Sequence, residues 1–380
     1  MTHNWTYKKL GELVNIHTGK LDANAANEGG QYPFFTCSRE PLRINSYSYD
    51  CECVLVAGNG ELNVKYYNGK FDAYQRTYII EKKQEVDYIS TYYIYLFFQK
   101  YIDVLRRGSI GGIIKYIKLG DLTNALIPIP SLDEQQAIVR ELDGINRLID
   151  LQEEQLREYD RLAQAIFVDM FGNPLHNDKR WETKNLGDLS VKIANGYNAK
   201  LEPDTYKAQG IPYFRCQNIW WNRIDASDLA YIDEQTNEKM KSSSLKKNDL
   251  IISKIGRVYT ENSSLGRTAM YEGEDYCANL SGNLCFVRLK DTICPKFVLS
   301  ILTFEEYRKW AMKNTPGGID KRAMSVGQIS KFPIILPPLA LQQTFAAQIE
   351  TIEQQKALIR RSLDETRTLL AARMQYYFNS

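Results

Sequence analysis

Two stretches of the chain gather the side chains that read nucleic-acid bases and neutralise phosphates. Arg, Lys, Asn and Gln hydrogen-bond to base edges in the major groove, and aromatic side chains accompany them here. An ordinary solvated loop would explain any one of these residues, but we expect each cluster as a whole to contact DNA. The candidates are Arg39, Arg43, Asn45, Tyr47, Lys65, Tyr66, Gln75 and Arg76 in the first stretch, and Arg215, Gln217, Asn218, Trp220, Asn222, Lys254, Arg257, Tyr259 and Arg267 in the second.

Catalytic chemistry is not predicted for this chain. His3, His17 and His176 are scattered, without the spacing of a catalytic triad or a metal site. The sequence lacks a phosphate-binding Gly-x-x-x-x-Gly-Lys-Ser/Thr loop and a dinucleotide fingerprint. The segment Phe171–Leu175 contains a single Asn-Pro step, which we interpret as a helix stop. We therefore expect a protein that is not an enzyme and that binds no cofactor.

Charge and cysteine content limit the alternatives further. The net charge of +2 is small for a protein that would hold DNA alone, so partner subunits are expected to add basic surface. Seven cysteines without a secretion signal indicate reduced thiols, and Cys51 and Cys53 form a close pair without a second pair to complete a zinc site. The absence of an apolar run of membrane-spanning length predicts a cytoplasmic protein with no membrane contact.

The elements that would position these residues come from an internal duplication. Four segments recur in the same order, at an offset that grows from 176 to 207 residues, which makes duplication the natural explanation. The extra residues therefore lie inside the second globular part. The pairs are Trp5–Leu13 with Trp181–Leu189, Tyr32–Cys37 with Ile211–Cys216, Gly111–Lys115 with Gly317–Lys321, and Ile129–Gln136 with Leu336–Gln343.

Each copy begins with a mixed, strand-rich part of α+β class. Short runs of β-branched and aromatic residues bounded by turn residues predict strands. Helices are expected around 92–101 and 295–312. The Gly-Gly loops at 111–112 and 317–318 would fit either a phosphate cradle or a tight turn, and we favour the turn. The predicted strands are Cys53–Ala57, Thr77–Ile80, Asp249–Ser253 and Leu284–Arg288.

Each copy ends in a long helix. Ser131 and Glu134 have the spacing of a capping box, and apolar residues follow in alternating steps of four and three up to about Phe171, with Gln152 in the one gap. Residues 207 further on repeat the pattern in phase but less strongly. About 40 residues would give a helix roughly 60 Å long. The predicted pairing residues are Ile138, Leu142, Ile149, Leu156, Ile349, Ile359 and Leu363; the outward faces, with Glu141 and Glu153, are expected to be solvated or to face a partner.

This doubled arrangement resembles the specificity subunit of type I restriction–modification enzymes. The pattern Pro-x-Leu-x-x-Gln-Gln opens both long helices, at Pro130–Gln136 and Pro337–Gln343, and the likeness extends over essentially the whole chain. The resemblance implies target-recognition domains at 1–130 and 173–337. It also implies spacer helices at 131–172 and 338–380 that pair as an antiparallel coiled coil with pseudo-two-fold symmetry.

The resemblance further implies a function and a set of partners. Each recognition domain would read one half of a split site on double-stranded DNA, and the helices would set the gap between the halves. Two methyltransferase subunits and the restriction (motor-nuclease) subunits would supply the chemistry. Two alternatives stay open at this point: a coiled-coil scaffold for protein interactions, and the recognition subunit of a related system with a fused methyltransferase–nuclease partner. The bases that are read and the spacer length are not encoded in any recognisable pattern.

Overall fold

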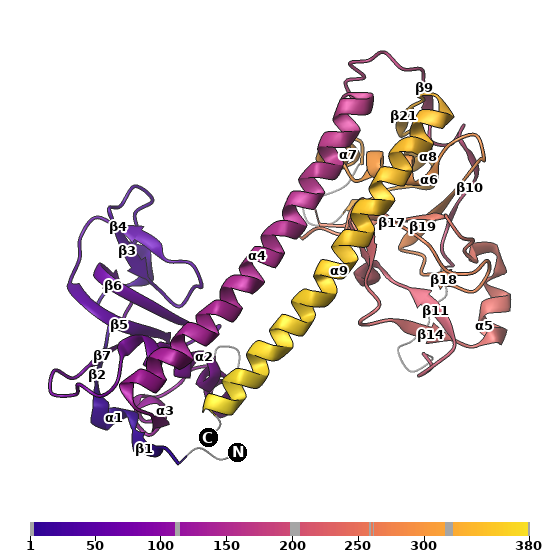
Figure 1. The fold of residues 1–380 in the computed structure, drawn as a ribbon. Helices are drawn as coiled ribbons and strands as arrows, with labels where there is room; N and C mark the ends of the chain where they lie inside the picture. The colour runs from indigo at the N-terminus through magenta and orange to yellow at the C-terminus, as the bar shows by residue number, and fades with distance from the viewer. Residues whose placement is uncertain are drawn as a thin grey trace. The chain divides into compact units, whose positions relative to one another are not determined.

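The computed structural model describes residues 4–110, 115–197, 206–257, 260, 262–315 and 322–378. The chain forms two compact units, one made of Met1–Leu156 with Leu358–Ser380 and the other of Arg157–Ala357. Each unit contains a globular part together with portions of two long helices, α4 (Leu132–Phe171) and α9 (Leu339–Phe378) (Figure 1). None of the helices in the described ranges is long and apolar enough to cross a membrane.

The first unit is built around a six-stranded sheet with the order β2-β7-β5-β6-β3-β4. All neighbours in this sheet are antiparallel except β3 and β6, which pair in parallel at Phe34–Asp72 and Phe35–Ala73. Its elements are β1 (Thr6–Lys9), α1 (Leu10–Leu13), β2 (Val14–Thr18), η1 (Ala23–Ala25), β3 (Tyr32–Phe35), β4 (Leu42–Ile44), β5 (Tyr49–Ala57), β6 (Val64–Ala73), β7 (Thr77–Lys82), α2 (Thr91–Gly108), α3 (Leu119–Thr123) and β8 (Leu126–Ile129).

The second unit has a four-stranded sheet, β10-β19-β15-β17, and a three-stranded sheet, β14-β11-β18. Its elements are β9 (Thr183–Asn185), β10 (Ser190–Asn195), β11 (Ile211–Phe214), η3 (Cys216–Asn218), β12 (Ile219–Trp220), β13 (Arg223–Ile224), β14 (Ala230–Ile232), α5 (Glu234–Lys239), η4 (Lys241–Ser243), β15 (Leu250–Ser253), β16 (Ile255–Gly256), β17 (Thr268–Met270), β18 (Asn279–Leu280), β19 (Leu284–Leu289), α6 (Pro295–Leu302), α7 (Glu305–Lys313), β20 (Arg322–Ala323), α8 (Val326–Ser330) and β21 (Pro333–Ile335).

The duplication predicted from the sequence is visible in the strand pairing. In the first unit β3 pairs in parallel with β6 at Phe35–Ala73, and in the second β11 pairs in parallel with β18 at Phe214–Leu280. The ten-residue strand β6 corresponds to the 13 residues 268–280, in which 271–278 separate β17 from β18, so this part of the second copy is three residues longer. This insertion is one source of the growing offset between the two copies.

Two glycines make the same close approach in both copies. A Cβ on Gly19 would lie 2.1 Å from the carbonyl oxygen of Ala73, and one on Gly196 would lie 2.2 Å from that of Ser281. A Cβ atom cannot lie this close to a backbone oxygen, so any residue other than glycine is excluded at these two positions beside the parallel strand pair. The segments following β2 and β10 are therefore held against the same part of the sheet in each unit.

The first glutamine of each Pro-x-Leu-x-x-Gln-Gln motif joins the long helix to its globular part. Gln135 is buried; its Nε2 donates to the carbonyl oxygens of Tyr88 (2.8 Å) and Pro130 (3.0 Å), and its Oε1 accepts from the N–H of Ser90 at 3.0 Å. Ser90 is the N-cap residue of α2, so the side chain connects the starts of two helices.

Gln342 repeats this arrangement in the second unit. Its Nε2 donates to the carbonyl oxygen of Pro337 at 2.7 Å, and its Oε1 accepts from the N–H of Cys294, the N-cap residue of α6, at 3.0 Å. The second glutamines, Gln136 and Gln343, are exposed. The residues that carry the family resemblance thus have a structural role at the joint between helix and globular part.

The positions that the heptad spacing predicts for pairing lie on the buried or half-buried sides of the two long helices. Ile138, Leu142, Ile349 and Leu363 are buried, and Ile149, Leu156 and Ile359 are half-buried. The α4 helix begins with the predicted capping box, in which Ser131 N–H donates to Glu134 Oε2 at 2.9 Å, and ends before Gly172 at φ 75°.

Polar contacts show that the helices run antiparallel in each unit. In the first unit Gln152 Nε2 donates to Ser362 Oγ at 2.9 Å and Arg367 pairs with Glu153 at 2.7 Å. In the second unit the buried Lys356 pairs with Asp160 at 2.7 Å. Our expectation that Glu153 and Glu141 lie on a solvated or partner-facing surface is wrong, because both pair across the helices; Glu141 contacts Arg373.

Both cores join the sheet, the flanking helices and the long helices of the same unit. In the first, Phe97 of α2 is fully packed between the sheet and Phe378 of α9, with ring centroids 6.0 Å apart. In the second, Phe167 of α4 stacks on Phe297 of α6 at 5.6 Å and meets Phe345 of α9. Burying aromatic side chains of this size dominates core energetics, so the long helices belong to the folded units and are not appendages.

Candidate nucleic-acid interface

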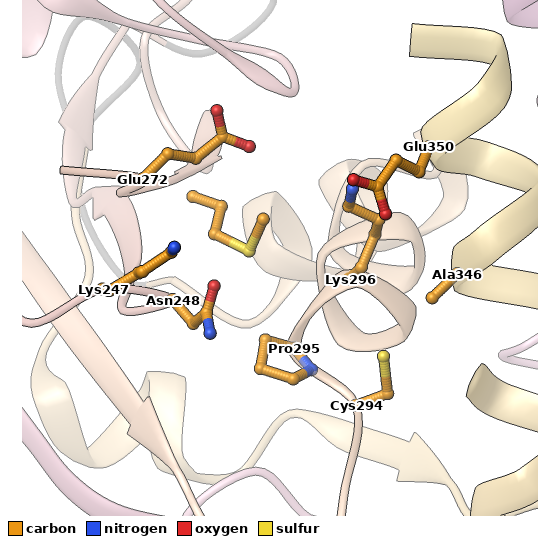
Figure 2. Close-up of a pocket in the computed structure, with 9 residues that line it drawn as sticks. Lys247, Asn248, Glu272, Cys294, Pro295, Lys296, Ala346 and Glu350 are labelled. Atoms are coloured by element: carbon orange, nitrogen blue, oxygen red, sulfur yellow. The ribbon is translucent and has the colours of Figure 1, made fainter. Parts of the chain in front are cut away.

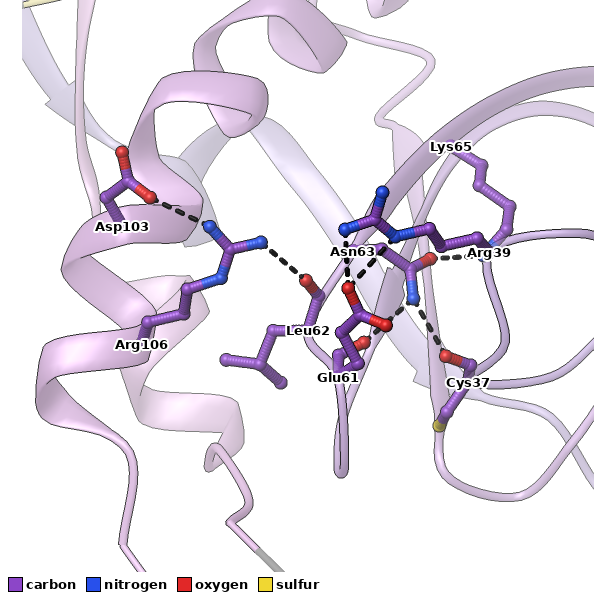
Figure 3. A network of polar contacts seen from close by, with 8 residues as sticks. All are labelled: Cys37, Arg39, Glu61, Leu62, Asn63, Lys65, Asp103 and Arg106. Atoms are coloured by element: carbon purple, nitrogen blue, oxygen red, sulfur yellow. Dashed lines mark hydrogen bonds and ion pairs between the residues drawn. The ribbon is translucent and has the colours of Figure 1, made fainter. Parts of the chain in front are cut away.

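Three loops of the first unit come together beyond the ends of its strands. One follows β3, one connects β5 to β6, and one connects β6 to β7; residues of the first two are drawn in Figure 3. Asn63 Nδ2 donates to the carbonyl oxygen of Cys37 at 2.8 Å, and Arg39 Nε donates to Glu61 Oε1 at 2.9 Å. The Cys37 thiol contacts the carbonyl oxygen of Arg76 at 3.6 Å. A cavity of about 580 Å³ is lined by Cys37, Arg39 and Glu61 among others.

This loop cluster contains or adjoins four of the predicted residues: Arg39, Lys65, Gln75 and Arg76. Lys65 contacts Asn63 Oδ1, and burial lowers the pKa of its ammonium group (Figure 3). Arg39 is largely exposed but is paired with Glu61. Arg76 is exposed. Gln75, beside it, donates to Asp22 Oδ1 at 2.9 Å.

The remaining predicted residues of the first unit lie elsewhere on it. Arg43 and Asn45 are exposed in and just after the edge strand β4, and Tyr47 follows them with its ring 4.9 Å from that of Tyr32. Tyr66 packs against Tyr92 of α2 and donates to Glu52 at 2.8 Å. The structure therefore divides the first set of candidates between the loop cluster, the sheet edge and the helix-facing side of β6.

In the second unit the segment after β11 is fixed by a polar network. Arg215 pairs with Asp228 at 3.1 Å, and Gln217 Nε2 donates to the same carboxylate at 2.9 Å. Asn218 is 1% exposed. Its Oδ1 accepts from the Arg215 N–H, and its Nδ2 donates to the carbonyl oxygens of Asp225 and Asp228. Because backbone groups of the protein occupy its amide, Asn218 has a structural role in holding this segment.

A turn with two tryptophans lies next to this network. The guanidinium of Arg267 lies 3.8 Å from the centre of the Trp220 ring, and that of Arg308 lies 5.8 Å from the Trp221 ring. Asn222 has φ 53° at the tip and donates to Glu353 of α9 at 3.2 Å. Sequence reasoning missed Trp221 and Arg308; the signal available was the Trp220–Trp221 doublet itself.

Two further predicted residues belong to the segment that follows β15. Lys254 is 9% exposed and donates to Asn195 Oδ1, and burial lowers the pKa of its ammonium group. Arg257 is exposed. Tyr259 and the Gly-Gly loops at 111–112 and 317–318 lie outside the described residues.

A second cavity of the second unit contains none of the predicted residues. It measures about 520 Å³ and is lined by Lys247, Lys296, Glu272 and Glu350, with Cys294 at one side (Figure 2). Both charge signs are present there without a cluster of one sign. No group of three or more His, Cys, Asp or Glu side chains in the described ranges is arranged to hold a metal ion.

The thiols of the first sheet are chemically quiet. Burial raises the pKa of Cys51 to about 11 and raises that of Cys53 further, so neither is a thiolate at neutral pH. The candidate site chemistry is therefore that of the loop clusters, whose guanidinium and amide groups can hydrogen-bond to base edges and phosphates and are accompanied by aromatic side chains.

Comparison with known proteins gives a consistent picture. The family described as type I restriction modification DNA specificity domain matches residues 2–159 and 178–366. The EcoDI specificity subunit of Escherichia coli is 38% identical over 186 residues, which are 48% of this chain and 40% of that protein. A putative type I specificity subunit of Haemophilus influenzae is 24% identical over 91% of this chain and 87% of its own length.

The chain's matches thus span about two fifths of the first two curated relatives, the second being a putative specificity subunit of Methanocaldococcus jannaschii matched over 38% of its length. Among solved structures, a type I S subunit from M. genitalium aligns over 99% of this chain and 96% of its own, with a TM-score of 0.59 at 16% identity. This likeness shows a shared fold of two tandem domains, each followed by a long helix.

Proposed function

Because the chain belongs to the type I restriction modification DNA specificity family, we propose that it is the non-catalytic subunit that reads a split DNA site. Each unit would read one half of the site through its loop cluster. The observation that carries the proposal is the duplication, since the family matches both halves of the chain and the two units share strand pairing, close-approach glycines and the glutamine joint.

The two units differ where specificity would reside. The strands and joints correspond, whereas the loops carrying candidate base contacts do not: one has Arg39, Lys65 and Arg76, and the other has Arg215, Trp220 and Arg267. Base readout depends on which donors and acceptors meet each base edge. A protein that reads two different half-sites needs different loops, and here these loops stand on corresponding strands.

Partners are part of the proposal. With no catalytic constellation recognised in the sequence, methyl transfer and cleavage would come from two methyltransferase subunits and from restriction subunits. One protein of the same fold, 18% identical with a TM-score of 0.54, comes from work on complex assembly of the type I R-M system. The long helices, whose exposed leucines include Leu151 and Leu358, offer apolar surface for such partners.

The helices would also act as a spacer. An α-helix rises about 1.5 Å per residue, so each 40-residue helix has a fixed length that a flexible linker lacks. Fixed length matters because half-sites on one face of DNA lie about one helical turn, or roughly 34–36 Å, apart or a multiple of it.

A binding selection tests the proposal directly. The full chain, purified with its methyltransferase subunit, would be mixed with a library of random duplexes, and the retained DNA would be sequenced. We expect two short fixed sequences separated by a gap of constant length. Retention without any enriched sequence would contradict a recognition role, and a single uninterrupted motif would contradict the assignment of one half-site to each unit.

A further inference from the structure

The second unit carries three buried or half-buried cations that no described carboxylate neutralises. Arg267 belongs to the segment that leads from β16 to β17, Arg308 donates to that segment, and Lys254 directly precedes β16. Arg267 is 5% exposed, and Arg308 and Arg267 each have a buried Nε without a hydrogen-bond partner among the described residues. Burying cations without counterions is costly, so such a cluster calls for an anion.

Geometry places the two guanidinium groups at one spot. Arg267 donates to the carbonyl oxygen of Asn262 at 2.7 Å and Arg308 donates to that of Thr260 at 3.0 Å, two residues apart on the same segment. The rings of Trp220 and Trp221, consecutive residues of one turn, lie under these two arginines. The pKa of Arg267 is lowered by burial and, to a lesser extent, by the positive charge of Arg308.

The first unit has the same framework with other residues at the corresponding positions. Backbone hydrogen bonds identify the counterparts. In the first unit the Ala57 N–H donates to the Asn63 carbonyl oxygen, and in the second the Ser253 N–H donates to the Arg267 carbonyl oxygen. Asn63 is therefore the counterpart of Arg267. In the same way, the Ile117 N–H donates to the Gly58 carbonyl oxygen, and the Met324 N–H donates to that of Lys254. Gly58 of the first unit is therefore the counterpart of Lys254 in the second.

The counterpart of Arg308 is present in the first unit but is neutralised. Arg106 of α2 donates to the carbonyl oxygen of Leu62 at 3.0 Å, as Arg308 does to Thr260, and it also pairs with Asp103 at 2.9 Å (Figure 3). Arg39 beside it is paired with Glu61 (Figure 3). Arg106 and Arg39 of the first unit are therefore paired with carboxylates, whereas no described carboxylate pairs with Arg267 or Arg308 in the second.

We propose that Arg267 and Arg308 form an oxyanion site in the second unit that binds a backbone phosphodiester of duplex DNA. The first unit has no such site at the corresponding place. The proposal rests on the proposed function for its ligand, whereas the placement of Arg267 and Arg308 without a paired carboxylate among the described residues is independent of that function. It predicts that Arg308 contributes to the salt dependence of DNA binding.

Salt dependence of DNA affinity tests this with a matched pair of variants. The full chain would be titrated with a 20-base-pair duplex at several salt concentrations, as wild type, Arg308→Gln, Arg308→Lys and Arg106→Gln. Each lost phosphate contact reduces the slope of log K against log salt by about 1, which is roughly a tenfold loss of affinity at 0.1 M salt. Arg308→Gln should show this loss, Arg308→Lys should retain most of the slope, and Arg106→Gln should match wild type.

A second readout separates the site from the proposed function. Inorganic pyrophosphate should raise the melting temperature of wild type and of Arg106→Gln but not of Arg308→Gln. If that dependence holds while wild type fails to bind duplex, the anion site stands and DNA recognition is contradicted. If neither assay depends on Arg308, the site is refuted. Glu261 is the sole acidic residue between Lys254 and Arg267, and anion binding seen only in Glu261→Gln would likewise refute it.

Discussion

Removing the Gln135 side chain should loosen the joint between α4 and the first globular part. The side chain makes three hydrogen bonds, to the carbonyl oxygens of Tyr88 and Pro130 and from the N–H of Ser90. A typical bond of this kind contributes about 0.5–1.5 kcal/mol net, so Gln135→Ala should lower the free energy of unfolding by about 3 kcal/mol. Domain stabilities are roughly 5–15 kcal/mol, which makes this a large fraction.

The chain supplies its own control for this prediction. Gln136 is the next residue of the same motif, with the same helix propensity, but it is exposed. Gln136→Ala should therefore change the free energy of unfolding by no more than about 0.5 kcal/mol. Gln342→Ala, with two bonds lost, should cost about 2 kcal/mol in the second unit, and Gln343→Ala should again be nearly neutral.

Urea unfolding combined with hydrogen exchange measures both the size and the place of the effect. Exchange read by mass spectrometry assigns a loss of protection to peptides of one unit. We expect Gln135→Ala to weaken protection around Ser90 and the start of α4, and Gln342→Ala to do so around Cys294. Equal stability of Gln135→Ala and Gln136→Ala would refute the role given to the motif.

Three further perturbations have definite expected results. Lys356→Met should leave the free energy of unfolding unchanged or raise it by up to about 2 kcal/mol in urea titrations, because an apolar residue replaces a buried ammonium whose carboxylate partners keep other contacts. Asp160 is mostly exposed to water, and Glu353 also accepts a hydrogen bond from Asn222; a large loss would contradict this. The Arg373 guanidinium holds the pKa of Glu141 below its ordinary 4.5, so this carboxylate stabilises the fold above that pH and the benefit disappears as the pH falls. Glu141→Gln should thus be less stable than wild type at pH 7, and the difference should shrink as the pH falls through the lowered pKa of Glu141; a difference independent of pH would count against the ion pair. Adding one heptad to both α4 and α9 should lengthen each by about 10 Å, and sequencing of selected DNA should show a gap about 3 base pairs longer between unchanged half-sites; loss of both halves would argue against the spacer role.

The long helices could be predicted because their determinants are local. A capping box, an alternating four-three spacing and a glycine stop each act within a few residues, and α4 begins at Leu132 and ends at Phe171 accordingly. For the same reason, three of the four predicted strands lie within β5, β7 and β19, and the fourth covers β15 and the one residue before it. The stretch predicted as helical at 295–312 divides into α6 and α7 at Phe304, whose ring packs on Phe167 of α4, a contact remote in sequence.

The candidate interface was less predictable because it depends on which loops meet. Arg39 and Arg215 follow corresponding strands, but their carboxylate partners Glu61 and Asp228 come from other segments. Asn218 looks like a base-reading amide in the sequence, yet three backbone contacts occupy it. Charge balance between Arg308 and its neighbours depends in the same way on packing. The abundance of polar and aromatic residues near turns identified these regions in the sequence. Which of their side chains are bonded to other parts of the protein depends on the fold.

The central claim is that this chain directs a modification enzyme to a split DNA sequence. A genome-wide map of adenine methylation in the native host, with and without the gene for this chain, tests that claim most directly. The account predicts one bipartite motif that is methylated only when the gene is present, with both half-sites read in a single experiment. An identical map in the two strains would contradict it.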